Sequence, residues 1–174
     1  MHVVKTLFVS VAVSCVLIGL TGCDSEADKA QSFIQQTAAS AHPEQLKAFH
    51  RKVGDLDITI TYRYKDDVIL SQTAQNTIPY RVLPANNRAE AMNRMNKISD
   101  VYHQLPGVVQ KVEFLNGRAH ENLTVDFTKA TIKQLCGLKD ISVGMIITDC
   151  SAKYLTMSGV EKFMREQEFE TLTF

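Results

Sequence analysis

The chain has 174 residues, with 19 basic and 19 acidic side chains, so its formal charge at pH 7 is zero. This balance lacks the basic surface that nucleic-acid binding requires, and no basic cluster follows the N-terminal region to hold the chain on anionic lipid. The length suits one domain with a hydrophobic core. Composition therefore excludes a nucleic-acid-binding protein and leaves other functions open.

The first 22 residues have the pattern of a secretory signal peptide. Lys5 provides a basic start and residues 7–20 form an apolar run that is short for a membrane span. Residues 20–23, Leu-Thr-Gly-Cys, resemble the lipobox of bacterial lipoproteins, in which the cysteine thiol receives a diacylglyceryl group and the signal is cut just before it. The alternative is an ordinary signal anchor with a chance cysteine. We predict that Cys23 carries acyl chains such as palmitate, which hold the mature protein on a membrane.

Asp24 bears on which membrane that is. In enterobacteria-like cells, an aspartate directly after the lipidated cysteine resembles the signal for retention in the inner membrane. The protein is then expected to face the periplasm. In a Gram-positive host it would face the extracellular side of the cell membrane.

Two cysteines remain after the N-terminal region. Cys15 leaves with the signal and Cys23 is taken by lipid, so Cys136 and Cys150 form an even pair. In an oxidising envelope such a pair is a disulfide candidate. The alternative is two buried free thiols, because the sequence does not give their separation.

The pattern after Cys23 divides the mature chain into a tether and a domain. Residues 23–53 are polar and rich in alanine and glutamine, with a few apolar residues such as Leu46 and Phe49 that could line short helices. We predict a partly helical tether there and a folded domain over residues 54–174.

The domain is predicted to begin with a hairpin and a helix. Residues 56–65 alternate apolar and polar side chains, Asp66-Asp67 makes the turn, and residues 68–82 return as a less regular strand whose Pro79 suggests a sheet edge. Asn87 and Glu90 have capping-box spacing before an amphipathic helix that ends at Pro106-Gly107.

A second hairpin and a closing segment follow. Residues 108–114 and 120–127 alternate around Asn116-Gly117, which predicts a type I′ turn. A helical turn is expected over residues 131–135, an amphipathic helix over 157–167 and a closing strand over 169–174. Two hairpins with intervening helices predict an α+β fold, an antiparallel sheet with its helices packed on one face.

Several of these segments together resemble the YehR-like lipoproteins, a group of uncharacterised bacterial proteins. The opening strand at residues 60–65, the Leu105–Val108 junction, residues 111–114 and 121–127, and the last helix occur in the order and spacing of that family. The resemblance covers residues 53–169 and implies an α+β fold on a lipid anchor. It carries no catalytic or ligand residue, and Cys136 and Cys150 are not part of the family pattern.

Candidate catalytic residues are few. The chain has no GxGxxG, P-loop, GxSxG, HExxH or CxxC motif. Asp66 and Asp67 could form an acid/base pair or bind a cation, or they could simply stabilise the hairpin turn in which they lie. His103, His120 and Glu113 could form a zinc site if the second hairpin packs back on the helix end, whereas His103 alone suits a helix C-terminus and His120 a solvent-facing strand position.

The methionines, the strand tyrosines and the C-terminal acidic residues could each form a functional surface or have an ordinary structural role. Four methionines could line an adaptable groove or fill the core, and the tyrosines at 62 and 64 could stack on a ligand or pack on a half-buried strand. The core interpretation is favoured for both. The acidic residues between 161 and 170 alternate with Lys162 and Arg165 as on a solvated face.

These patterns predict a non-enzymatic envelope lipoprotein. We expect its domain to contact an envelope protein or a small apolar ligand, with no cofactor, no metal and no assigned ligand-binding residue. The alternative is an envelope hydrolase or metal-dependent enzyme that uses carboxylates with His103 or His120.

Overall fold

The fold is taken from a computed structural model that describes residues 42–138, 145–147 and 149–173. The chain divides into two units, residues 1–41 and 42–174, and only the second is described. Cys23, Asp24 and the predicted signal peptide therefore lie outside the described residues, as does part of the predicted apolar run between the two cysteines.

One antiparallel sheet organises this unit. Its strands are β1 (Gln45–Val53), β2 (Leu56–Lys65), β3 (Val68–Pro79), β4 (Val108–Phe114), β5 (Arg118–Asp126) and β6 (Glu170–Leu172). Their spatial order is β4-β5-β3-β2-β1-β6, and every neighbouring pair is antiparallel.

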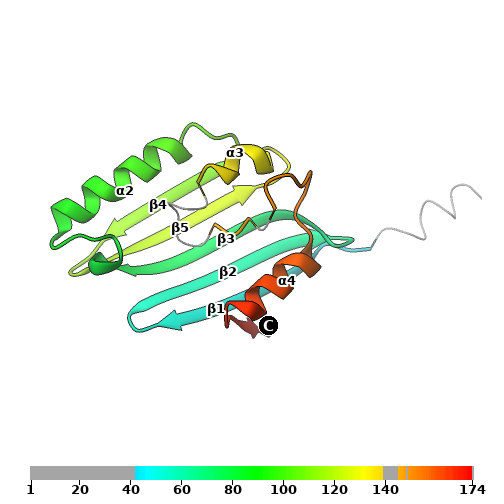
Figure 1. Ribbon diagram of the computed structural model, residues 1–174, viewed down its shortest axis with the longest axis horizontal. Helices are drawn as coiled ribbons and strands as arrows, with labels where there is room; N and C mark the ends of the chain where they lie inside the picture. The colour runs from blue at the N-terminus through cyan, green and yellow to red at the C-terminus, as the bar shows by residue number, and fades with distance from the viewer. Residues whose placement is uncertain (1–41, 139–144, 148, 174) are drawn as a thin grey trace, which may run out of the picture. The chain divides into compact units, whose positions relative to one another are not determined.

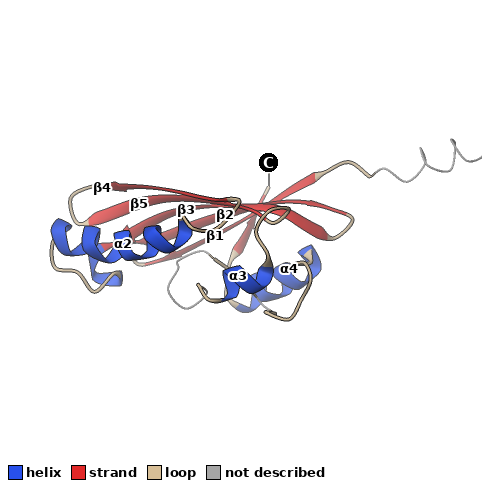
Figure 2. Ribbon diagram, turned by 90° about the horizontal axis from the view of Figure 1, so that it is seen from above, coloured by secondary structure: helices blue, strands red, loops and turns tan. Residues whose placement is uncertain are grey.

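The helices are η1 (Tyr80–Val82), α2 (Arg88–Tyr102), α3 (Ile132–Cys136) and α4 (Met157–Glu166). α2 lies by β4 and β5, whereas α4 lies by β1 and β2 (Figure 1). Seen along the sheet, α2, α3 and α4 occupy the same side (Figure 2). The predicted α+β class, with helices on one face, is confirmed.

The sheet begins earlier than the sequence pattern predicted. Residues 45–53 were assigned to the tether as short helices, but they form β1, which pairs with β2 along its whole length. The predicted boundary at residue 53 is therefore wrong, and the β1–β2 pair adds a third hairpin to the two predicted ones. Gly54, with φ of 61°, sits in its turn. The predicted closing strand, in contrast, is confirmed as β6, which pairs with β1.

β3 differs from its prediction in position. Pro79 indicated a sheet edge, yet β3 lies between β2 and β5 in the interior of the sheet. Pro79 is accommodated because it is the last residue of the strand, where it faces Arg118 and the chain leaves into η1. A proline at a strand terminus removes a donor only from the end of the ladder.

Both hairpin turns lie where they were predicted, but the type I′ geometry occurs at Asp66-Asp67 and not at Asn116-Gly117. Asp66 and Asp67 both have positive φ, 49° and 67°, as a type I′ turn requires. In the Asn116-Gly117 turn, only Gly117 has positive φ, 75°, so the predicted type I′ assignment is wrong there. Aspartate and asparagine tolerate the left-handed region, so composition alone does not distinguish the two cases.

Capping side chains set where the longer helices begin. Asn87 accepts a hydrogen bond from the Glu90 backbone N–H at 3.0 Å, as predicted for α2. The helix ends at Tyr102 with His103 as its C-cap, before the predicted end at Pro106-Gly107. At α3, Thr131 and Gln134 form a complete capping box.

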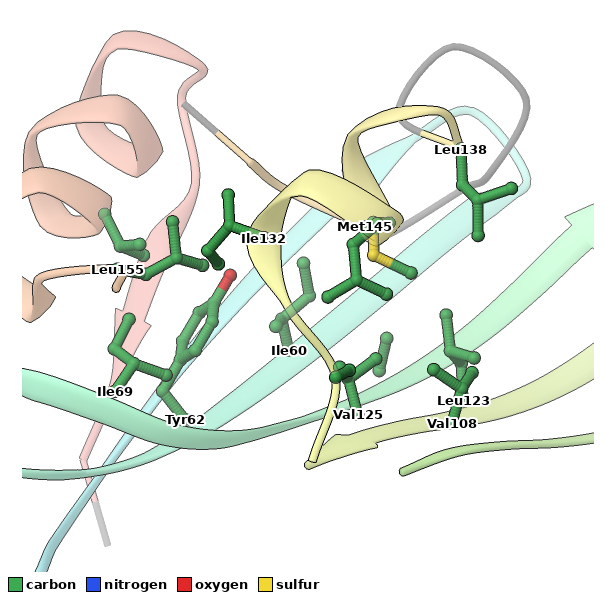
Figure 3. Packing of buried hydrophobic residues seen from close by; sticks show 14 of the residues in the cluster. Ile60, Tyr62, Ile69, Val108, Leu123, Val125, Ile132, Leu138, Met145 and Leu155 are labelled. Atoms are coloured by element: carbon green, nitrogen blue, oxygen red, sulfur yellow. The ribbon is translucent and has the colours of Figure 1, made fainter. Parts of the chain in front are cut away.

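The core fills the space between the sheet and the helices. Ile60, Tyr62 and Ile69 from β2 and β3 face Ile132 and Leu155 across this space (Figure 3). A smaller cluster beneath α2 joins Met95 to residues of β3 and β5. The alternation of buried and half-exposed residues along β2 and β5 thus reflects one face against helices and one face without them.

A disulfide joins two segments on the helical side. Cys136, the last residue of α3, is bonded to Cys150, and their Cα atoms are 5.7 Å apart. The bond ties α3 to the segment that leads into α4, 14 positions further along the chain. The structure therefore contains the disulfide that was predicted from the cysteine count.

Candidate functional site

The two faces of the sheet differ in chemistry. The strand aromatics Phe49, Tyr62, Tyr64 and Phe114 all pack into the core clusters. The alternate positions on β2, β3 and β5 carry hydroxyl, amide and charged side chains, which belong to Thr59, Thr61, Thr73, Gln75, Thr77, His120, Asn122 and Thr124. We call this second surface the open face.

The open face is hollowed into a shallow groove of about 560 Å³. Gln75 on β3 and Asn122 on β5 lie opposite each other in it, with Thr59 of β2 on one side and Lys111 of β4 on the other. Neighbouring strands are about 4.8 Å apart, so these four side chains form a row across the sheet. The row can donate and accept hydrogen bonds through Thr59, Gln75 and Asn122, and Lys111 adds a positive charge at its β4 end.

A second row in the groove holds titratable groups. Register places Glu113, His120, Thr77 and Asp57 side by side on β4, β5, β3 and β2. The Thr77 hydroxyl and His120 Nδ1 are 3.4 Å apart. Asp57 Oδ1 is 2.9 Å from Nε2 of His50 on β1, and both side chains are about one third exposed. The row therefore combines two carboxylates, one imidazole and one hydroxyl, and the His50 imidazole lies beside its Asp57 end.

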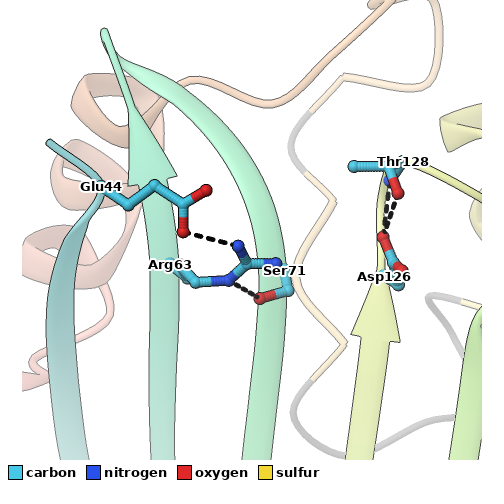
Figure 4. A network of polar contacts seen from close by, with 5 residues as sticks. All are labelled: Glu44, Arg63, Ser71, Asp126 and Thr128. Atoms are coloured by element: carbon cyan, nitrogen blue, oxygen red, sulfur yellow. Dashed lines mark hydrogen bonds and ion pairs between the residues drawn. The ribbon is translucent and has the colours of Figure 1, made fainter. Parts of the chain in front are cut away.

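At the opposite end of the strands, polar side chains of the open face are held in place by hydrogen bonds and an ion pair. Arg63 pairs with Glu44 at 2.6 Å and donates to the Ser71 hydroxyl at 3.2 Å (Figure 4). Asp126 accepts two hydrogen bonds from Thr128, from its hydroxyl at 2.5 Å and its backbone N–H at 3.0 Å. These bonds, the hydroxyl first, lower the pKa of the Asp126 carboxyl.

A buried polar cluster lies on the other face, beneath α2. The Glu121 carboxylate, only 5% exposed, accepts hydrogen bonds from the side-chain amides of Asn76, at 2.8 Å, and Gln110. Ser99 of α2 donates to Gln110. Burial raises the pKa of Glu121, and the two amide donors oppose that shift. This cluster links β3, β4, β5 and α2 through a single acidic group.

Asp66 and Asp67 do not act as a pair. Asp66 Oδ1 lies 2.7 Å from His42 Nδ1 at the surface. The Asp67 carboxylate accepts from the Ser158 backbone N–H at 2.7 Å and from its hydroxyl at 2.8 Å, and the Asp67 carbonyl accepts from the Met157 N–H at 2.8 Å. Asp67 therefore holds the N-terminus of α4, whose unpaired N–H groups need acceptors.

His103, His120 and Glu113 are only partly brought together. Glu113 and His120 face each other on β4 and β5, whereas His103 is the C-cap of α2. Among the described residues, no group of three or more His, Cys, Asp or Glu side chains is arranged to hold a metal ion. Nor is any helix of the described part long and apolar enough to cross a bilayer.

The remaining candidates fill the core. Met95, Met157 and Met164 are buried, and only Met92 is exposed. Tyr62 is fully buried, and Tyr64 packs partly buried against the same cluster. The core interpretation of both sets is therefore confirmed. Of the acidic run, Glu161 pairs with Lys47 of β1 at 2.5 Å, and the others are exposed.

Two groups were not found from the sequence. His50 and Asp57 meet only because β1 is a strand, and β1 was assigned to the tether. Glu121 had a usable signal, since it shares the inward phase of Ala119, Leu123 and Val125 on β5. A carboxylate at an inward position needs partners, and this could have predicted a buried polar cluster.

An antiparallel sheet with helices over one face and a polar open face defines the class of this unit, a two-layer α+β domain. The chain belongs to the family described as "Protein of unknown function (DUF1307)", whose model matches residues 45–170. It is 28% identical to the uncharacterized lipoprotein YehR of Escherichia coli over 170 residues, or 98% of each chain. It is 30% identical to the uncharacterized lipoprotein Lin0239 of Listeria innocua over 132 residues, covering 76% of this chain and 84% of that one.

Solved structures agree with this assignment. The NMR structure of E. coli YehR matches with a TM-score of 0.62 at 28% identity, over 76% of this chain and 93% of that one. A protein from Streptococcus pneumoniae shares the fold with a TM-score of 0.51 at 14% identity, over 97% of this chain and 99% of that one. The predicted membership of the YehR-like lipoproteins is confirmed.

Proposed function

We propose that this chain is a non-enzymatic envelope lipoprotein that binds a protein partner through the open face of its sheet. Lipid on Cys23 would hold it at the cell membrane. Asp24 favours the inner membrane with the domain facing the periplasm in a Gram-negative host, and the extracellular side applies in a Gram-positive one. The lipid anchor is supported by the Leu-Thr-Gly-Cys sequence and by relatives that are named lipoproteins.

The observation that carries the proposal is the unequal covering of the sheet. Helices pack on one face (Figure 2), while the other carries the polar groove. Antiparallel sheets commonly leave one face solvated, and here that face is an organised strand surface that is available for recognition. Rigid strands also hold their side chains in fixed rows, which lowers the entropy that binding must overcome.

The chemistry of the groove favours a polar protein segment over the small apolar ligand that was the other prediction. Gln75 and Asn122 offer amide donors and acceptors at the centre, and Lys111, Glu113 and Asp57 add charges of both signs at the margins. A polypeptide with exposed main-chain groups and mixed charges complements this pattern. An apolar ligand would desolvate these groups without replacing their hydrogen bonds.

Site-specific photocrosslinking tests the proposal. A photoreactive residue at Gln75, exposed in the groove, is compared with one at Lys97, exposed on α2, in full-length protein in intact cells. We expect a defined crosslinked envelope protein from position 75 and none from position 97. Thr73→Arg, which places a bulky cation in the next row of the open face, should remove that product.

Two results would contradict the proposal. Equal crosslinking from positions 75 and 97 would show that the open face is not selective. A product that persists unchanged in Thr73→Arg would place the contact elsewhere. The anchor is tested separately with Cys23→Ser, which should abolish labelling by palmitate and release the protein from the membrane fraction, and retention of both would refute it.

A further inference from the structure

The outer edge of β4 is an unpaired strand edge with a defined hydrogen-bond pattern. Among the described strands, β4 pairs only with β5. Bonds from Asp126 N–H to the Gly107 carbonyl and from Leu115 N–H to the Arg118 carbonyl, 2.8 and 2.9 Å, fix the phase of the ladder. Hydrogen-bonded pairs alternate along an antiparallel ladder. The backbone groups of Val109, Lys111 and Glu113 therefore point to β5, and those of Gln110, Val112 and Phe114 point outward.

The side chains on the open face of this edge are exposed and alternate in character. Val109 is 56% exposed, and Lys111 and Glu113 are also exposed. No proline or bulge interrupts β4, whose register against β5 is continuous. Strand edges are commonly protected by prolines, bulges, charged side chains or a covering element, because an open edge is a template for pairing. The exposed charges on β4 are one cation and one anion, so a second copy can meet each of them with the opposite charge.

We propose that β4 pairs edge to edge with β4 of a second copy of this chain, antiparallel and centred on Val112. A two-fold axis at that residue places Val112 opposite its own copy and Gln110 opposite Phe114 of the other copy. Both are pairs of outward-pointing backbone groups, so the main chains bond directly. The same register sets Lys111 opposite Glu113 of the second copy, twice.

Charge selects this register over its neighbours. Lys111 and Glu113 occupy non-hydrogen-bonded positions of the new ladder, where facing Cα atoms are about 4.5 Å apart and side chains are closest. Moving the axis to Lys111 would place two lysines opposite each other, and moving it to Glu113 would place two glutamates opposite each other. Like charges directly opposite destabilise a sheet. Centring on Val112 also sets exposed Val109 against Leu115 of the second copy.

The pairing is self-complementary, as a two-fold interface must be. It joins two open faces into one continuous polar surface, because the sheet continues through the axis. The inference does not depend on the proposed partner, since it rests on β4 alone. If the chain binds a partner through the open face but stays monomeric, the proposed function stands and the β4 pairing is refuted.

Charge reversal tests the register in full-length lipoprotein extracted in detergent. K111E and E113K each convert two ion pairs into two like-charge pairs, and we expect dimerisation to weaken by about tenfold or more in sedimentation measurements. The double variant K111E/E113K should dimerise like wild type. An equimolar mixture of K111E and E113K should form mixed dimers. Lys65→Glu, a charge change on the open face away from β4, serves as the control.

Cysteine pairing gives a second measurement in membranes. When K111C and E113C copies are produced together, each mixed dimer places one cysteine opposite the other and keeps one Lys111–Glu113 pair. We expect oxidation to crosslink this mixture and neither variant alone. Wild type that is monomeric at tens of micromolar, single reversals without effect, or crosslinking of K111C alone as strongly as of the mixture would each overturn the proposal.

Discussion

The two faces of the sheet obey different rules although the same strands form both. On the helical face, Tyr62 and its neighbours are enclosed, and each polar group there needs its own partner. On the open face, Thr61 and the adjacent rows meet water, and side chains are organised by strand register and by half-exposed polar contacts such as that between His50 and Asp57. Stability is therefore concentrated on one face, which leaves the composition of the other free for recognition.

The largest expected effect comes from alanine substitutions at two adjacent positions of β2, one on each face of the sheet. Tyr62→Ala should lower the free energy of unfolding by about 3–5 kcal/mol, because it empties a large fully buried site. Thr61→Ala, one residue away on the open face, should change it by less than about 0.5 kcal/mol. Urea denaturation of both variants measures the difference, and similar values would show that the two faces are not distinct.

Tyr62→Phe sharpens that test. Within the described residues, the Tyr62 hydroxyl is buried without a hydrogen-bond partner, and burial raises its pKa. Removing the hydroxyl should therefore keep or slightly increase stability. A loss above about 1 kcal/mol would reveal a partner for this group.

The next effect concerns the disulfide. Replacing Cys136 and Cys150 together by serine should lower the free energy of unfolding by about 3 kcal/mol, the value expected for opening a loop of this length. The bond lies on the helical side, so amide NMR signals of Gln75 and Asn122 in the groove should stay in place. Large shifts there would show that the open face depends on the disulfide.

A smaller effect is expected at the β2–β3 turn. Asp67→Gly preserves the positive φ of 67° but removes the carboxylate that accepts from Ser158 at the start of α4, and it should cost about 1 kcal/mol. Asp66→Gly removes only an exposed contact to His42 and should cost less than about 0.5 kcal/mol. Thermal denaturation of the two variants checks this order, and its reversal would contradict the assignment of Asp67 to the helix.

The last effect, which is a change in the pH dependence of stability, involves Glu121. Because burial raises its pKa in the folded protein, its contribution to stability is complete below the unfolded pKa and is lost as pH rises through the folded pKa. Glu121→Gln should remove that dependence, so its stability relative to wild type should increase between pH 4 and pH 8. His120→Gln on the open face is the control. Parallel pH profiles for Glu121→Gln and wild type would refute this assignment.

Sequence patterns predicted the parts of the fold whose inward residues are apolar. β2 and α4 have such faces, as does β5 except at Glu121, and their positions were predicted closely. β1 was missed because two of its inward positions are charged. Lys47 reaches Glu161 on α4, and the Arg51 guanidinium lies 5.8 Å from the Phe169 ring centre. Their aliphatic stems cover the core while their charges remain near water, so the alternation of apolar residues disappears.

The candidate site was harder to predict for a different reason. Polar residues at outward strand positions look alike in the sequence, and which of them become neighbours depends on strand order. Thr77 and His120 meet because β3 lies between β2 and β5, and 43 residues separate them along the chain. Local patterns carry no information on such pairing, whereas the β4–β5 hairpin, which is local, was predicted.

The pairing of β6 with β1 has a consequence for the timing of assembly. β1 leaves the ribosome before any other described strand, and the residues that cover Ala48, Phe49 and His50 arrive last. During synthesis, Ala48, Phe49 and His50 therefore lack their β6 neighbours until the chain reaches residue 170. A chaperone that shields extended polypeptide would be needed most in that interval, and shortening the chain before Glu170 would make the interval permanent.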